Sequence, residues 1–135
     1  MCMIDDGERC AVHRSKVKKA RKLHTCNECG RQIAPGEEYE TADYLYDGCW
    51  FHNDTCSHCL VACDWLMRNC YGYMHEGVLE DLGEHASEYR FVPGLSIGIN
   101  RIVVGAKRQW RRFDRAGLMP IPKMPPPIHL AEAAE

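Results

Sequence analysis

Four cysteines in two pairs of equal spacing are the residues of this sequence best suited to chemistry. Each pair has the pattern Cys-x2-Cys, and 26 residues separate the two pairs, which are Cys26 with Cys29 and Cys56 with Cys59. Two such pairs supply four thiolates, the ligand set of a tetrahedral structural zinc site. The sequence therefore predicts one structural Zn²⁺ ion as its cofactor.

A shell of four cysteines also bears on catalysis. An open catalytic zinc site needs three protein ligands and a water, whereas four thiolates leave no free position, so we expect no enzymatic activity. A nuclease of the His-Asn-His type is a weaker alternative, suggested by His52, Asn53 and His58. Because His58 is placed between the two helical ligands Cys56 and Cys59, it should point away from their face.

The remaining cysteines are expected to be structural. Nine cysteines cannot all pair within one chain, so a disulfide framework is disfavoured. Cys63 and Cys70 follow the second pair at helical spacing and are predicted to lie in the core. Two alternatives stay open: His52 as a replacement ligand, and a second metal site built from Cys2, Cys10 and His13.

Turn signals between the cysteines predict the elements that hold them. Gly30 directly follows the first pair and allows the tight turn of a zinc knuckle. Asp47-Gly48 is a two-residue hairpin signal. Asp54 or Thr55 can cap a following helix and so place the second pair on one helical face. The order of knuckle, hairpin and helix predicts a treble-clef-like module.

Two further helices are expected after this module. Residues 75–89 form an acidic amphipathic pattern, and a third helix is expected after Pro93-Gly94, capped by Ser96, with an apolar face that includes Phe113 and an end set by Gly117, Pro120 and Pro122. On that third helix Arg101, Arg108, Arg112 and Arg115 recur at helical spacing and predict a cationic stripe.

The fold class is therefore a small α+β zinc-bound domain, with boundaries set by composition. We expect a basic N-terminal arm at residues 1–24 and the treble-clef-like zinc module at 25–72. A helical extension follows at 73–117, and a Pro-rich flexible tail at 118–135. The first nine residues lack an apolar stretch and no run approaches about 20 apolar residues, so we expect a cytoplasmic protein without a membrane partner.

The net charge of −2 conceals three segments of opposite sign. Residues 9–31 hold eight basic residues and one acidic residue. Residues 32–90 hold two basic and twelve acidic residues, and residues 101–123 hold seven basic residues and one acidic residue. The basic segments could fold onto the acidic one, or meet a polyanion. In the second case the contact residues would be Lys16, Lys18, Lys19, Arg21, Lys22, Arg108, Arg111 and Arg112.

The cysteine region also resembles two known families. The motifs that carry the likeness are Cys26-x2-Cys29-Gly30-x2-Ile33-x2-Gly36-Glu37-x-Tyr39, Asp47-Gly48 and Cys56-x2-Cys59. They resemble the poly(ADP-ribose) polymerase-type zinc finger, which binds broken DNA but has a histidine where this chain has Cys56. They also resemble a family of short uncharacterised proteins of tailed bacteriophages and prophages, and there the likeness covers most of the chain.

The phage resemblance implies that the protein acts in the cytoplasm of a bacterial host. Because the sequence also lacks a complete set of catalytic residues, this resemblance favours an accessory protein that binds a host protein or nucleoprotein complex. Such a protein could inhibit, for example, a defence nuclease or CRISPR effector. The alternative is a DNA- or RNA-binding zinc finger that uses the basic residues named above.

Overall fold

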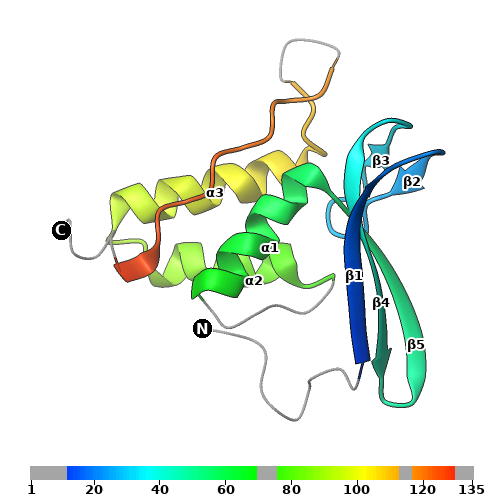
Figure 1. Cartoon of the computed structure of the whole chain (residues 1–135). Coiled ribbons are helices and arrows are strands. Elements are labelled where there is room, and N and C mark those ends of the chain that lie inside the picture. Colours follow the sequence, from blue (N-terminus) through cyan, green and yellow to red (C-terminus); the bar gives the residue numbers. More distant parts are fainter. Residues whose placement is uncertain (1–11, 70–75, 113–116, 130–135) are drawn as a thin grey trace.

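The computed structural model describes residues 12–69, 76–112 and 117–129, and within them it is an α+β fold (Figure 1). A three-stranded antiparallel sheet has the order β1-β4-β5, formed by β1 (Val12–Lys19), β4 (Glu38–Tyr46) and β5 (Cys49–Cys56). Two short strands, β2 (His24–Thr25) and β3 (Gln32–Ile33), pair antiparallel in a second sheet. Helices α1 (Ser57–Asn69), α2 (Val78–Glu88) and α3 (Pro93–Lys107) pack beside the larger sheet.

The hairpin between β4 and β5 turns where the sequence predicts. Asp47 and Gly48 both have positive φ angles, 51° and 77°, as a tight two-residue hairpin turn requires. Pairing then continues along the whole hairpin, from Tyr46 opposite Cys49 to Tyr39 opposite Cys56. The hairpin thereby delivers Cys56 to the end of the sheet next to β2 and β3.

Strand β1 differs from the separate basic arm expected for residues 1–24. Its eight residues pair with β4 from Val12 opposite Leu45 to Lys19 opposite Glu38. The paired residues lie 19 to 33 positions apart in the sequence, so no local sequence signal identifies the pairing. The basic side chains of this segment are therefore carried on an edge strand of the sheet.

Helix α1 begins one residue later than predicted. Cys56 is the last residue of β5 and not a helical residue, because its pairing with Tyr39 holds its backbone extended. Asp54 and Thr55 likewise lie inside β5 and do not act as helix caps. The core face of α1 includes the fully buried Trp65, whereas Met67 is 57% exposed.

Helices α2 and α3 supply eight of the nineteen buried residues in the described apolar core, and α1 supplies five more. The core-facing side chains of α2 include Val78 and Leu82, and those of α3 include Leu95, Ile99 and Ile102. The expected helix at residues 75–89 is thus confirmed with shorter bounds. In the described parts of the chain, no helix combines the length and apolar character needed to cross a bilayer.

The third helix starts and ends earlier than predicted. It begins with Pro93 in its first turn instead of a Ser96 cap. It ends at Lys107, after which Gln109 and Trp110 have positive φ angles of 55° and 59° and the chain reverses. The predicted cationic stripe along one helix is therefore wrong, because Arg108 and Arg112 both lie beyond the helix. The predictions for Phe113 and Arg115 fall outside the described residues.

Trp110 is the reason that the chain turns back. Its ring packs directly over Gly105, and its backbone N–H donates to the Gly105 carbonyl at 2.8 Å. Any Cβ at position 105 would overlap that ring. Trp110 is almost fully buried, as its apolar character predicts, but in a reversed segment and not in the helix.

Residues 117–129, which we call the C-terminal strap, do not form the free tail that their composition predicts. The Met119 N–H donates to the Trp110 carbonyl at 2.7 Å, and near the other end the Trp65 indole N–H donates to the Pro126 carbonyl at 3.1 Å. The Ile128 N–H donates to the Asn69 side chain at 3.1 Å. Figure 1 shows the strap crossing α3 on its way between these anchors.

The close packing at Gly105 gives a test of the fold. We expect Gly105→Ala to lower the free energy of unfolding by about 1–3 kcal/mol, because the new methyl group must displace the Trp110 ring. Gly83→Ala in α2 is the matched control, since nothing lies within 4 Å of its Cβ position, and it should stabilise by about 0.5–1 kcal/mol. Urea denaturation measures both, and equal effects of the two substitutions would contradict this packing.

Candidate metal centre

The four predicted cysteine ligands converge on one point. The Sγ atoms of Cys26, Cys29, Cys56 and Cys59 all lie within 4.8 Å of one another. Cys26, Cys56 and Cys59 are fully buried or nearly so, and Cys29 is partly exposed. No other group of at least three cysteine, histidine or carboxylate side chains has this geometry among the residues that the structure describes.

The spacing of the sulfurs fits zinc. With Zn–S bonds of about 2.3 Å, the sulfurs of a tetrahedral site are separated by about 3.8 Å. The Cys29 and Cys56 sulfurs are 3.9 Å apart. The hydrogen bond from Cys29 lowers the pKa of the Cys26 thiol, while the Cys26 sulfur raises the pKa values of Cys29 and Cys59. Four thiols this close together can exchange their protons for one divalent cation.

A tight turn places the first pair. The Gly30 N–H donates to the Cys26 carbonyl at 2.9 Å, and the Cys26 N–H donates to the Arg31 carbonyl at 2.9 Å. Gly30 has a φ of 83°, a conformation that favours glycine. The Cys56 N–H points at the Cys26 sulfur from 3.4 Å, so a backbone donor from β5 already faces a ligand of the first pair.

The two residues between the first cysteines attach the turn to the rest of the fold. Asn27 exchanges hydrogen bonds with Asp54 of β5, one through its side chain and one through its backbone, both at 2.8 Å. The Glu28 carboxylate accepts from the Glu76 and Val78 N–H groups at the start of α2, where a negative charge is favourable. Burial raises the pKa of Glu28 to about 7.

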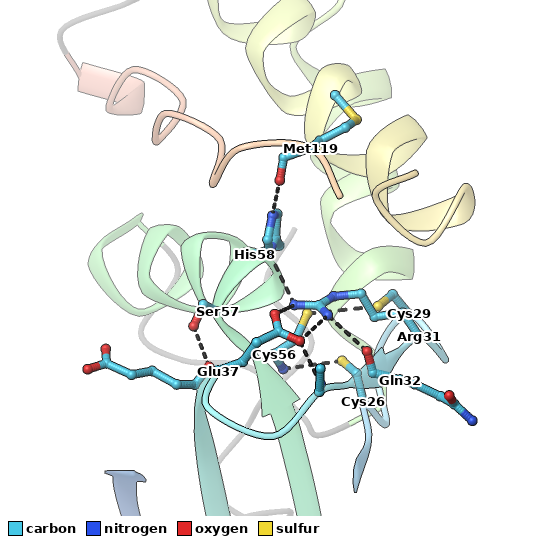
Figure 2. A network of polar contacts seen from close by, with 11 residues as sticks. Cys26, Cys29, Arg31, Gln32, Glu37, Cys56, Ser57, His58 and Met119 are labelled. Carbon is cyan, nitrogen blue, oxygen red and sulfur yellow. Dashed lines mark hydrogen bonds and ion pairs between the residues drawn. The ribbon is translucent and has the colours of Figure 1, made fainter. Parts of the chain in front are cut away.

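A buried arginine lies beside the cysteine cluster (Figure 2). Arg31 is only 5% exposed, and its guanidinium contacts both Glu37 carboxylate oxygens at 3.1 and 3.2 Å. Burial lowers the pKa of this guanidinium, but Glu37 and Cys56 outweigh that effect and raise it. Four thiolates and one Zn²⁺ would carry two net negative charges, and Arg31 supplies a buried positive charge against them. Sequence patterns do not identify Arg31, because only the fold brings it to the cluster.

His58 extends this network to the C-terminal strap. One ring nitrogen, Nδ1, lies 3.3 Å from the Arg31 guanidinium, and the other, Nε2, lies 2.6 Å from the Met119 carbonyl. Since a carbonyl only accepts, Nε2 carries the proton and Nδ1 accepts from Arg31, which defines a neutral imidazole. Burial lowers the pKa of His58, in agreement with this state.

The other sequence-predicted candidates lie elsewhere. Cys63 is buried in the core, as predicted, and is not part of the four-cysteine cluster. His52 is exposed on β5, where it contacts Asp43 and Asp54, so it replaces no ligand. His52 and His58 have separate partners and do not converge on one site. Cys2, Cys10 and Cys70 lie outside the described residues, as does the side chain of His13.

The predicted basic contact residues form two exposed groups. Lys16, Lys18 and Lys19 lie in β1, and Arg21 and Lys22 lie in the bend that follows it. The second group, Arg108, Arg111 and Arg112, lies just beyond the end of α3.

The metal centre can be tested by substitution. We expect the purified protein to hold one Zn²⁺ per chain. Cys59→Ala should lose the ion together with cooperative thermal unfolding, because a structural zinc contributes directly to folding. Cys49→Ser is the matched control, since Cys49 is exposed on β5 and should be neutral. Native mass spectrometry and circular dichroism measure these outcomes, and a metal-free, cooperatively folded wild type would contradict the assignment.

His52 provides a test at the sheet surface. Its hydrogen bond to Asp43, at 2.8 Å, raises its pKa, and Asp54 contributes to the same shift. Because the pKa of His52 is higher in the folded protein than in the unfolded chain, its protonation stabilises the fold. This stabilisation is fully present at pH values below the unfolded-state pKa of about 6.5, and it is lost as the pH rises through the folded-state pKa.

We therefore expect Asp43→Asn to lower the His52 pKa in an NMR titration and to destabilise the protein more at pH 6 than at pH 9. Asp47→Asn in the hairpin turn is the control and should leave the titration unchanged. An unaltered His52 titration in Asp43→Asn would show that the contact is not formed in solution.

The sequence matches no protein-family model, and neither a curated protein nor a solved structure gives a significant match.

Proposed function

We propose that this chain is a non-catalytic, zinc-stabilised binding module whose ligand is a nucleic-acid strand, alone or within a nucleoprotein complex. The metal centre, with the knuckle, hairpin and helix in a treble-clef-like order, would be the scaffold of this module. Four cysteine ligands leave the ion no open position, which supports a structural role for it.

The observation that carries this proposal is that two distant basic segments join one polar network. On one side, Ala20 lies between the basic residues of the first group and is fixed by backbone hydrogen bonds to Gly36 and Glu37, both at 2.8 Å. Glu37 binds Arg31, which contacts His58.

On the other side of this network, His58 binds the Met119 carbonyl, and the Met119 N–H donates to Trp110, which lies within the second basic group. The two groups are separated by more than eighty residues in the sequence, yet both are fixed to the same support next to the metal centre. Fixed, exposed cations of this kind are suited to a polyanionic backbone.

The sheet adds a second supporting feature. Side chains alternate between the two faces of a strand, so Lys16 and Lys18 of β1 share a face. The strand registers place Trp50 of β5 on that same face, opposite Leu45. Trp50 is 58% exposed, and an exposed aromatic ring on the same sheet face as the lysines offers a base a surface to stack on, while the lysines neutralise phosphates farther along the strand.

The resemblance to bacteriophage proteins extends this proposal to a host target. A bacterial nucleoprotein, such as a CRISPR effector or a defence nuclease on its nucleic acid, would present the same polyanionic backbone. Support for this extension comes from the sequence resemblance, while the basic groups support the nucleic-acid contact itself. Recovery of a stoichiometric nucleoprotein from bacterial lysate would support it, and recovery of no such complex would count against it.

The experiment for the nucleic-acid contact is a salt titration. We expect the zinc-loaded protein to bind a fluorescein-labelled single-stranded DNA, with affinity that falls as sodium chloride rises. Lys16→Gln combined with Lys18→Gln should weaken binding and reduce the slope of log K against log salt by about 1.4, that is about 0.7 for each phosphate that a lysine no longer neutralises.

The matched control combines Arg68→Gln with Arg90→Gln, which makes the same change of net charge at exposed positions outside both basic groups. This control should bind like the wild type. Binding that is insensitive to salt, or equally weakened in both double variants, would contradict the proposal.

A further inference from the structure

A groove lies between α3 and the C-terminal strap. Its volume is about 1010 Å³, and its walls are formed by residues from Gly94 to Arg108, in α3 and just beyond its end, and by strap residues from Met119 to Pro126. At about 1.5 Å of rise per residue, the α3 wall is about 20 Å long. This is the length of a short peptide segment.

The groove exists because the strap is attached only near its two ends. Met119 is held by Trp110 and His58 at one end, and Pro126 is held by the Trp65 indole at the other. Close to that second anchor, Pro125 and Pro126 pack against Gly98 of α3. Between the anchors the strap crosses α3, and Pro120 and Pro122 remove backbone donors from its middle.

The groove exposes apolar side chains that a folded chain normally buries. Ile97 and Val104 of α3 line it and are 54% and 51% exposed. Met119 and Met124 of the strap face the same space and are more than one-third exposed. A contiguous exposed apolar surface of this kind marks an interaction site, and methionine adapts its shape to different apolar partners.

The charges around the groove have a single sign. Arg101 of α3, Arg108 just beyond its end and Lys123 of the strap line it, and none of the described lining residues is acidic. Along this wall the cations alternate with the apolar residues in the order Ile97, Arg101, Val104, Arg108. The complementary surface therefore combines apolar and acidic side chains at matching intervals.

We propose that this groove binds an acidic amphipathic peptide segment of a partner protein. Apolar side chains of the segment pack on Ile97, Val104 and the two strap methionines, and its carboxylates pair with Arg101 and Lys123. This site is distinct from the basic strand β1 proposed to contact nucleic acid, although one end of the groove includes Arg108 of the second basic group. A nucleic acid at β1 and a protein segment in the groove would therefore occupy different surfaces.

The test starts from a display library of random 14-residue peptides panned on the zinc-loaded protein, with the best enriched peptide then labelled for fluorescence anisotropy. We expect enrichment of peptides that contain both acidic and apolar residues. Ile97→Glu and Arg101→Glu should each weaken binding of the labelled peptide by about tenfold or more, because each disrupts the centre of the contact.

Two control variants match these changes outside the groove. Met67→Glu introduces the same charge at an equally exposed apolar position of α1, and Arg68→Glu reverses an exposed arginine. Both should bind the peptide like the wild type, as should the Lys16→Gln and Lys18→Gln double variant. All variants are checked for bound zinc and thermal unfolding, so that weaker binding is not mistaken for an unfolded protein.

Three results would overturn the proposal. The first is the absence of any enriched peptide, or enrichment of basic or purely apolar peptides. The second is peptide binding that Ile97→Glu and Arg101→Glu leave unchanged. The third is displacement of the peptide by single-stranded DNA together with weaker DNA binding by Ile97→Glu, which would assign the groove to nucleic acid.

Discussion

The convergence of four thiolates is the constraint on which the other contacts of this protein depend. A chain of 135 residues has a limited core, and here two cysteines of a short turn must meet two cysteines at the junction of β5 and α1. Asn27 fixes the turn to β5 and Glu28 fixes it to the start of α2, so the cluster connects the sheet to the helices. The buried charge of Arg31 is balanced between this cluster and Glu37.

Local features of the sequence predict a large part of this arrangement. The two Cys-x2-Cys pairs identify the metal centre without knowledge of the fold, because ligand type and spacing determine what they can bind. Asp47-Gly48 identifies the hairpin turn, since both positions need positive φ angles. The three helices are predicted from apolar periodicity, with errors of a few residues at their ends.

The parts that could not be predicted depend on contacts between distant residues. The pairing of β1 with β4 is set by the completed sheet and has no signal within residues 12–19. Trp110 fits the helical periodicity of α3, but its ring is better buried by folding back over Gly105, which ends the helix early. The strap has the proline-rich composition of a flexible segment, yet two of its carbonyls accept hydrogen bonds from α1, one from His58 and one from Trp65.

The arrangement of the tryptophans gives the molecule a built-in optical readout. Of the three tryptophans, Trp65 donates its indole N–H to the strap, Trp110 accepts a backbone hydrogen bond from it, and Trp50 is exposed on β5 far from it along the chain. Because indole fluorescence shifts to longer wavelength in water, detachment of the strap would shift the tryptophan emission to longer wavelength, and no attached dye would be needed to measure it. With Trp50 replaced by phenylalanine, the remaining emission would follow the strap at both of its anchors.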